Sequence, residues 1–153
     1  MKTIIAPNKF GDMKRSPYVA LAGHYSNGST PDWRAEVTAH LEPLKGTILD
    51  PRPERNSYWN PTMGSDEFKE QFTWELNALD RADVTAFYFM PGSKSPITLL
   101  QLGLFVRRSL IVCCPKGFQN RGHVDHIVER YGLTRVEDLN ELKEAIAARL
   151  GLM

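Results

Sequence analysis

Gln101 is a polar residue inside a segment that is otherwise apolar and is predicted to form a buried helix. Ser95 is a natural N-cap for this helix, and Pro96 takes the first helical position, where a missing N–H costs nothing. Burying a side-chain amide is unfavourable by roughly 2 kcal/mol or more unless the amide is hydrogen-bonded. The sequence leaves two interpretations open: Gln101 bridges a structural network, or it faces a ligand.

Polar and aromatic residues also follow the first two predicted strands. In an open α/β sheet, ligands bind at the carboxyl ends of the strands, so both exit loops are candidate binding segments. Arg52 could orient an acid, contact a substrate or simply be solvated, and an aromatic ring in the loop after it could stack on a flat ring or pack within the loop. The candidates at these two exits are Gly23, Tyr25, Asp50, Pro51, Arg52 and Trp59.

The elements that must position these residues alternate regularly along the chain. We predict one α/β domain over residues 1–153, a flavodoxin-like three-layer sandwich with a five-stranded parallel sheet. Residues 1–17 are expected to form an extended arm that could include a short strand at Ile4-Ile5. The predicted strands are 18–22, 47–49, 84–89, 109–114 and 133–136, and the predicted helices are 33–44, 65–79, 96–108, 124–131 and 137–150.

Composition narrows the class of partner. Lysine and arginine number 19 against 18 acidic residues, which gives a formal charge of +1. A net charge so close to zero does not favour binding to nucleic acid or to an anionic membrane. The N-terminus lacks a signal-peptide pattern and no apolar run is long enough for a membrane span. We therefore expect a cytoplasmic protein with a small-molecule partner.

Cofactor and metal motifs are missing from the sequence. Neither a dinucleotide fingerprint nor a phosphate-binding P-loop is present. His123 and His126 are three residues apart and could share a metal, but only Asp125 is near enough to complete the set. Cys113 and Cys114 are adjacent in a predicted strand and point to opposite faces, so we expect reduced thiols rather than a disulfide. We predict no metal and no cofactor.

Several separate motifs resemble those of the nucleoside 2-deoxyribosyltransferase-like family. The resemblance extends from about Ile4 to Gly132 and is carried by motifs that recur in order. This sequence departs from the family at one important place, because Gln101 stands where the family has its catalytic glutamate. The matching segments are Asp50-Pro51-Arg52, the run from Phe68 to Glu75, Asp83, the run from Ser95 to Leu100, and Leu102-Gly103.

The resemblance implies an enzyme that cleaves the N-glycosidic bond of a 2′-deoxyribonucleoside. The sugar would form a covalent ester with residue 101 and then pass to another nucleobase or to water. Asp83 would protonate the departing base. Active sites of the family are often completed by a neighbouring subunit, so we expect a homodimer or larger oligomer with the 96–108 helix at the contact. The resemblance adds Ser95, Asn120 and His123 to the predicted substrate-binding residues.

Gln101 itself has three interpretations. The chain could be an engineered form made to hold substrate, which we favour because the remaining motif is intact. It could be a natural member that binds nucleosides without turnover, or another acid such as Glu75 could take over the role. Hydrolysis of a nucleoside or nucleotide, a nucleoside-binding sensor and, by fold analogy alone, a flavin protein stay open as alternatives.

Overall fold

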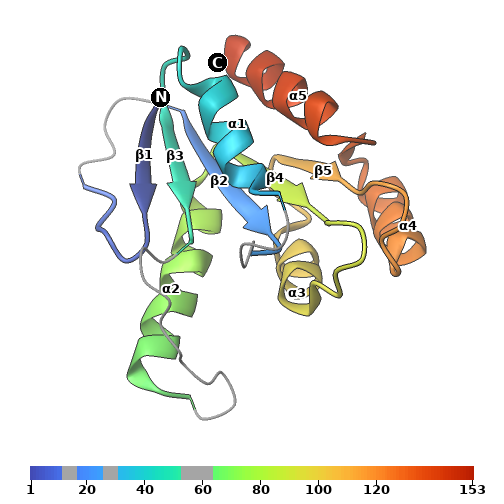
Figure 1. The fold of residues 1–153 in the computed structure, drawn as a ribbon, viewed down its shortest axis with the longest axis horizontal. Coiled ribbons are helices and arrows are strands. Elements are labelled where there is room, and N and C mark those ends of the chain that lie inside the picture. Colours follow the sequence, from blue (N-terminus) through green and yellow to red (C-terminus); the bar gives the residue numbers. More distant parts are fainter. Residues whose placement is uncertain (12–16, 26–30, 53–63) are drawn as a thin grey trace.

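The computed structural model describes residues 1–11, 17–25, 31–52 and 64–153. Strands and helices alternate along most of the chain (Figure 1). The strands are β1 (Lys2–Ile5), β2 (Tyr18–Gly23), β3 (Thr47–Asp50), β4 (Val84–Tyr88), β5 (Leu110–Cys113) and β6 (Thr134–Val136). The helices are α1 (Trp33–Leu41), α2 (Asp66–Arg81), α3 (Pro96–Phe105), α4 (Arg121–Tyr131) and α5 (Leu139–Gly151).

The strands of the described residues form one parallel sheet in the order β1-β3-β2-β4-β5-β6. Without β1, this is the strand order 2-1-3-4-5 of flavodoxin. The α/β prediction is confirmed, but the predicted number of five strands is wrong because the sheet has six. The extra strand lies within the segment expected to be an arm. Its sequence signal was only Ile4-Ile5, whereas β1 pairs with β3 along its whole length, from Lys2 to Ile5.

Helices cover both faces of the sheet and give it two separate cores (Figure 1). The strands in the middle of the sheet are buried except for the last residues of β2 and β4, as expected for a parallel sheet with helices on both sides. The first core contains Trp74, Ala78, Leu102, Phe105, Val124 and Val128 from α2, α3 and α4. The second core contains Trp33, Val37, Leu41, Leu142 and Ile146 from α1 and α5.

Side-chain caps explain where three of the helices begin. Asp32 accepts a hydrogen bond from Ala35 N at 3.1 Å, and Ser65 accepts one from Phe68 N at 3.2 Å. Asp138 caps α5 in the same way. Each cap satisfies a backbone N–H that has no partner inside its helix, which is worth about 1 kcal/mol. The caps at Asp32 and Ser65 fix where α1 and α2 begin, and both helices carry residues of the site described below.

The two cysteines are free and buried. Burial raises the pKa of the Cys113 thiol to about 12 and that of the Cys114 thiol to about 11. Because thiolates are the reactive form, the raised pKa values and the burial of both residues favour a packing role. The prediction of reduced thiols is confirmed.

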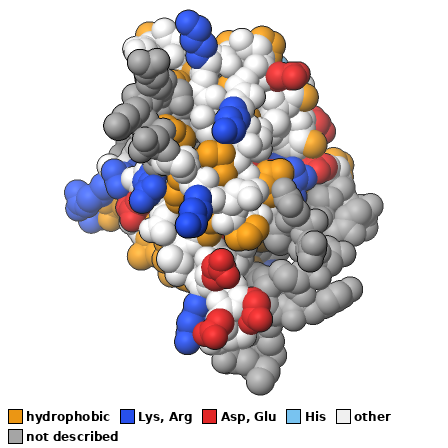
Figure 2. Space-filling view, turned by 90° about the vertical axis from the view of Figure 1, so that its left-hand side faces the viewer, with side chains coloured by type: hydrophobic (Ala, Val, Ile, Leu, Met, Phe, Trp, Pro, Cys, Tyr) orange, Lys and Arg blue, Asp and Glu red, His pale blue; other side chains and the backbone are white. Residues whose placement is uncertain are grey.

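The surface carries mixed charge. On the face shown in Figure 2, basic side chains are scattered and several acidic side chains gather at the lower end, with others at the edges of the view. Within the described ranges, no helix is both long and apolar enough to cross a bilayer.

Gly23 ends β2 where the chain passes very close to its neighbours. A Cβ at this position would lie 2.5 Å from Tyr88 O and 2.8 Å from Cζ2 of Trp33. The first contact is with backbone of the adjacent strand, which cannot rotate away. Gly23 therefore allows the carboxyl end of β2 to pack against both β4 and α1.

We expect Gly23→Ala to lower the free energy of unfolding by roughly 1–3 kcal/mol through overpacking. Urea denaturation of both proteins measures the difference. Gly122→Ala is the matched control, because a Cβ at Gly122 meets nothing within 4 Å. An unchanged denaturation midpoint for Gly23→Ala would show that β2 and β4 can separate without loss.

Candidate functional site

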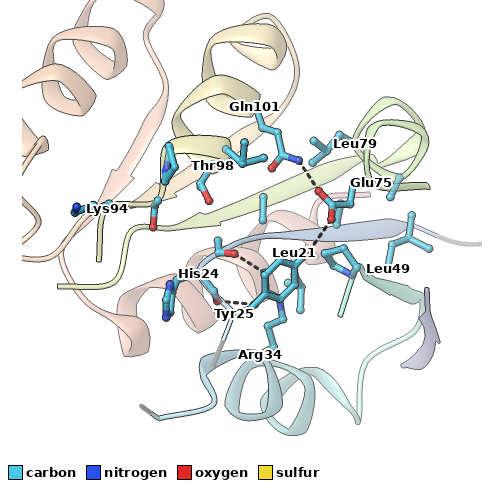
Figure 3. A pocket seen from close by; sticks show the side chains of 18 residues that line it. Leu21, His24, Tyr25, Arg34, Leu49, Glu75, Leu79, Lys94, Thr98 and Gln101 are labelled. Carbon is cyan, nitrogen blue, oxygen red and sulfur yellow. Dashed lines mark hydrogen bonds between the residues drawn. The ribbon is translucent and has the colours of Figure 1, made fainter. Parts of the chain in front are cut away.

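A cavity of about 330 Å³ opens at the carboxyl edge of the sheet, where α2 and the amino end of α3 meet the end of β2 (Figure 3). Its floor is largely apolar, with side chains of β2, β3 and α2. The polar side chains in its lining converge from four different segments. They are His24 and Tyr25 after β2, Arg34 of α1, Glu75 of α2, and Lys94, Ser95, Thr98 and Gln101 at or in α3.

Glu75 is the centre of the hydrogen bonds in this cavity. Its Oε1 accepts from Tyr25 OH at 2.7 Å and from Gln71 Nε2 at 3.1 Å, and its Oε2 accepts from Gln101 Nε2 at 3.0 Å. The Glu75 residue is 8% exposed. A carboxylate at this depth is stable because hydrogen-bond donors surround it. Gln101 therefore does both things that its sequence position suggested: it joins a network and it lines a cavity.

The orientation of Gln101 follows from this network. The amide nitrogen is used by Glu75, so the amide oxygen is the atom left to face the cavity (Figure 3). Gln71 also donates to Pro51 O at 2.6 Å, which ties α2 to the exit of β3. Glu75 is thus hydrogen-bonded to Gln101 of α3 on one side and to Gln71 on the other, and Gln71 in turn contacts the exit of β3.

Tyr25 is fixed by a second buried group, Arg34. The Arg34 guanidinium lies 4.7 Å from the centre of the Tyr25 ring and 4.6 Å from that of Trp33. It donates to His24 O at 2.7 Å and to Gly23 O at 2.8 Å. These contacts hold the chain after β2 so that the Tyr25 hydroxyl reaches Glu75.

Burial shifts the pKa values of Arg34 and of its neighbours His24 and Tyr25. Burial and the adjacent Glu75 raise the pKa of the Tyr25 phenol well above its usual range, so it stays a hydrogen-bond donor. Burial lowers the pKa of Arg34, while Tyr25 and Asp50 oppose the shift. Burial, and then Arg34, lower the pKa of His24, so its imidazole is neutral at pH 7.

The exit of β3 supports the site rather than forming it. Asp50 is fully buried and accepts from Arg52 N at 3.0 Å and from Arg52 Nη2 at 2.8 Å. It also lies 3.6 Å from Arg34 Nε. Arg52 pairs in addition with Asp32, the cap of α1. Of the predicted residues Asp50, Pro51 and Arg52, only Pro51 lines the cavity.

Asp83 does not lie beside Gln101, and its expected contact with the base is wrong. It immediately precedes β4 at the amino edge of the parallel sheet, whereas the cavity lies at the carboxyl edge. Its Oδ2 accepts from Tyr18 N at 2.8 Å, and its own N donates to Tyr18 O at 2.9 Å. Asp83 fastens the start of β4 to that of β2, and the acid that touches Gln101 is Glu75.

The remaining predicted residues separate into three groups. Ser95 is buried in the cavity lining and has a left-handed backbone with φ 43°. Asn120 is the N-cap residue of α4 and His123 lies in its first turn, and neither lines the cavity. Trp59 lies outside the described residues. Among the described residues, no cluster of three or more His, Cys, Asp or Glu could hold a metal.

The sequence is similar to a known protein family. The model of the family "Nucleoside 2-deoxyribosyltransferase like" matches residues 16–118. The chain belongs to this family. The matched range contains Arg34, Glu75 and Gln101 and ends before Asn120 and His123. The family implies nucleoside binding, and the cavity around Glu75 is where we expect it.

The fold has a counterpart among solved structures. A conserved protein from Enterococcus faecalis V583 superposes with a TM-score of 0.61 over 89% of this chain and 100% of that chain, at 13% sequence identity. At this identity the similarity concerns the fold alone. No curated protein matches the sequence.

We expect Asp83→Ala to lower the free energy of unfolding by about 1 kcal/mol, because Tyr18 N loses its acceptor. Its affinity for a 2′-deoxyribonucleoside should stay within about twofold, since Asp83 is at the far edge of the sheet. Tyr25→Phe, which removes a hydroxyl bonded to Glu75, should instead weaken binding. Chemical denaturation and calorimetric titration provide the two measurements. Weaker binding by Asp83→Ala without loss of stability would return Asp83 to the site.

Proposed function

We propose that this chain binds a 2′-deoxyribonucleoside with the anomeric carbon of the sugar facing residue 101. The contact between Gln101 and Glu75 carries the proposal. It places the residue that stands at the family's nucleophile position against a buried acid, inside the largely apolar cavity. The apolar floor suits a base or sugar ring, and the polar side chains can fix its orientation.

With glutamate at position 101, this arrangement supports transfer of deoxyribose. The carboxylate of residue 101 would attack C1′, a C–O ester bond would form, and the C1′–N bond would break with its electron pair leaving on the base. In that form one proton would be held between the two neighbouring carboxylates, and Glu75 would donate it to the departing base, the role that the sequence had suggested for Asp83. An incoming base would then attack C1′ from the face that the first base left, so that a new C1′–N bond forms as the ester C–O bond breaks, and the proton that this base loses would return to Glu75.

With glutamine at position 101, the same pocket lacks the charge that this step needs. A neutral amide is a poor nucleophile and cannot stabilise an oxocarbenium-like state with a full negative charge. Binding uses the shape of residue 101, which glutamine keeps. We propose that the chain as it stands binds its substrate and reacts with it slowly, whether as an inactivated transferase or as a nucleoside-binding sensor.

The sensor alternative is favoured by one observation. Gln101 donates to Glu75, so the amide completes the hydrogen bonding of the buried carboxylate instead of leaving a gap. Because the hydrogen bonds of Glu75 are satisfied without a nucleophile at position 101, the site is suited to a protein that binds a nucleoside without cleaving it. Turnover by the glutamate form separates the two functions.

We expect Gln101→Glu to release free base from a 2′-deoxyribonucleoside at least about 100-fold faster than the present chain, because a charge used in the transition state is restored. The two side chains are nearly isosteric, so the fold should be kept and the affinity should change little, while repulsion between the new carboxylate and Glu75 lowers the free energy of unfolding. Single-turnover chromatography measures base release, and mass spectrometry locates a deoxyribosyl adduct on residue 101.

Gln101→Leu provides the matched control, since it fills similar volume without a carboxylate and should release no base. Equal rates for the present chain and Gln101→Glu would contradict the assignment of residue 101. An adduct on Glu75 instead would make Glu75 the nucleophile.

We also propose that the chain forms a homo-oligomer through α3. The helix buries Thr98, Gln101, Leu102 and Phe105 on one side. Its other side exposes Ile97 at 51%, Leu100 at 50% and Leu104 at 60%. These three residues recur at helical spacing and form one apolar stripe, which a second subunit would cover. Ile97 also lines the cavity, so the contact would reach the rim of the site.

We expect the wild-type chain to sediment as a dimer or larger species at micromolar concentration and Leu100→Lys/Leu104→Lys to sediment as a monomer. Two lysines on the stripe would be desolvated without partners in the contact. Leu152→Lys is the control, because Leu152 is an exposed apolar residue at 87% that lies outside the stripe. A monomeric wild-type chain would remove the proposed contact.

A further inference from the structure

A second cavity, of about 380 Å³, lies at the amino edge of the sheet, opposite the candidate site. It is bounded by the segment after α3, the end of α4 and the starts of β5 and β6. The last turn of α5 adds Arg149. The lining shares no residue with that of the cavity around Glu75, so the two cavities are separate.

Arginine side chains give this second cavity its charge. Arg107, Arg108 and Arg149 line it, and none of the described residues in its lining is acidic. Arg108 pairs at 3.0 Å with Asp80, which does not line the cavity. Arg107 and Arg149 have no ion-pair partner within the described ranges. Two guanidinium groups therefore face the cavity without a counter-charge from a side chain.

The helix ends that line this cavity do not account for all three arginines. Val106 and Gly132, the C-cap residues of α3 and α4, both line it. The carboxyl end of a helix is equivalent to roughly half a negative charge, so the two ends offset about one arginine. Asp80 offsets Arg108. One positive charge is left over, which favours an anionic ligand.

Arg149 is held in place without being neutralised. Its Nη1 donates to Ser109 Oγ at 2.6 Å and its Nη2 to Thr134 Oγ1 at 2.7 Å. These neutral hydroxyls lie just before β5 and at the start of β6, so the guanidinium is fixed across the ends of two adjacent strands. Two of the roughly five N–H groups of a guanidinium are used in this way, and the others stay free for a ligand. A group that is already fixed loses little freedom when an anion binds.

We propose that this second cavity binds the phosphate group of a small phosphorylated molecule through Arg107 and Arg149. The number of donors favours phosphate: the two side chains offer more free N–H groups than the about four acceptor positions of a carboxylate can use. A phosphate adds a third oxygen and a second negative charge, and guanidinium groups bind it through paired hydrogen bonds. The site goes beyond the proposed function, which concerns the opposite edge of the sheet.

Calorimetric titration of the full chain with inorganic phosphate, glycerol 3-phosphate and acetate tests the proposal. Both phosphates should bind at least about tenfold more tightly than acetate, as expected for additional charge-assisted hydrogen bonds. Glycerol 3-phosphate should bind at least as tightly as inorganic phosphate, because the cavity has room for the body of a small molecule. Binding of inorganic phosphate alone would overturn the assignment to a phosphorylated molecule.

Matched variants locate the bound phosphate. Arg107→Gln and Arg149→Gln should each weaken the binding of glycerol 3-phosphate at least about tenfold, because each removes a guanidinium from the site. Arg130→Gln is the control for charge, since Arg130 is exposed in the last turn of α4 and does not line the cavity. Lys94→Gln is the control for a phosphate bound in the cavity around Glu75, which Lys94 lines. Both controls should keep the affinity within about twofold.

Three results would overturn the proposed phosphate site. They are equal affinity for phosphate and acetate, phosphate binding that survives in Arg107→Gln, and phosphate binding that is lost in Lys94→Gln. The last result would place the anion in the cavity around Glu75 instead. Arg107 is exposed and makes no contact that the fold needs, so Arg107→Gln keeps the test valid even if Arg149→Gln does not fold. Nucleoside affinity should be the same in Arg107→Gln and the unchanged chain, so the two proposals can fail separately.

Discussion

The buried carboxylate of Glu75 is the constraint on which the site depends. A charge at this depth is tolerated only when it is hydrogen-bonded, and its three donors come from different parts of the chain: Tyr25, Gln71 and Gln101. Satisfying one carboxylate therefore fixes the exit of β2, the middle of α2 and the first turns of α3 relative to one another. The cavity is the space that this arrangement encloses.

Arg34 of α1 is a second buried charge that must be satisfied, and it lies on the other side of the sheet. Its guanidinium is held between two aromatic rings and by the carbonyls of Gly23 and His24, with Asp50 as the nearest carboxylate. Arg52 then joins Asp50 to the cap of α1. These paired charges thus hold the exits of β2 and β3 next to the cavity.

Much of the fold could be predicted because parallel sheets have strong local signals. The alternation of apolar strands with amphipathic helices gave the α/β class and most of the strands and helices, and the caps at Asp32 and Ser65 marked two helix starts. β1 was expected only as a short strand that the arm could include at Ile4-Ile5, and it was not counted in the sheet, because an edge strand needs few apolar residues and its pairing with β3 is visible only in three dimensions. The number of strands therefore depended on a contact that local pattern does not encode.

The site was harder to predict for the same reason. Asp83 was assigned to the base because it belongs to a matching motif, but a residue before a parallel strand lies at the amino edge, which is the wrong end for a ligand. Arg34 was overlooked, although it lies on the apolar stripe of α1 with Val37 and Leu41, where a charged residue signals a buried role.

The substitution at position 101 changes more than the chemistry of one atom. Glutamine can donate to Glu75, whereas an ionised glutamate cannot, so two carboxylates in contact would repel unless one of them kept a proton. A catalytic pair here would therefore carry an electrostatic strain that the present chain avoids. Gln101 relieves that strain and satisfies Glu75. Both effects act in the same direction: they disfavour bond cleavage and preserve a site that can bind its ligand.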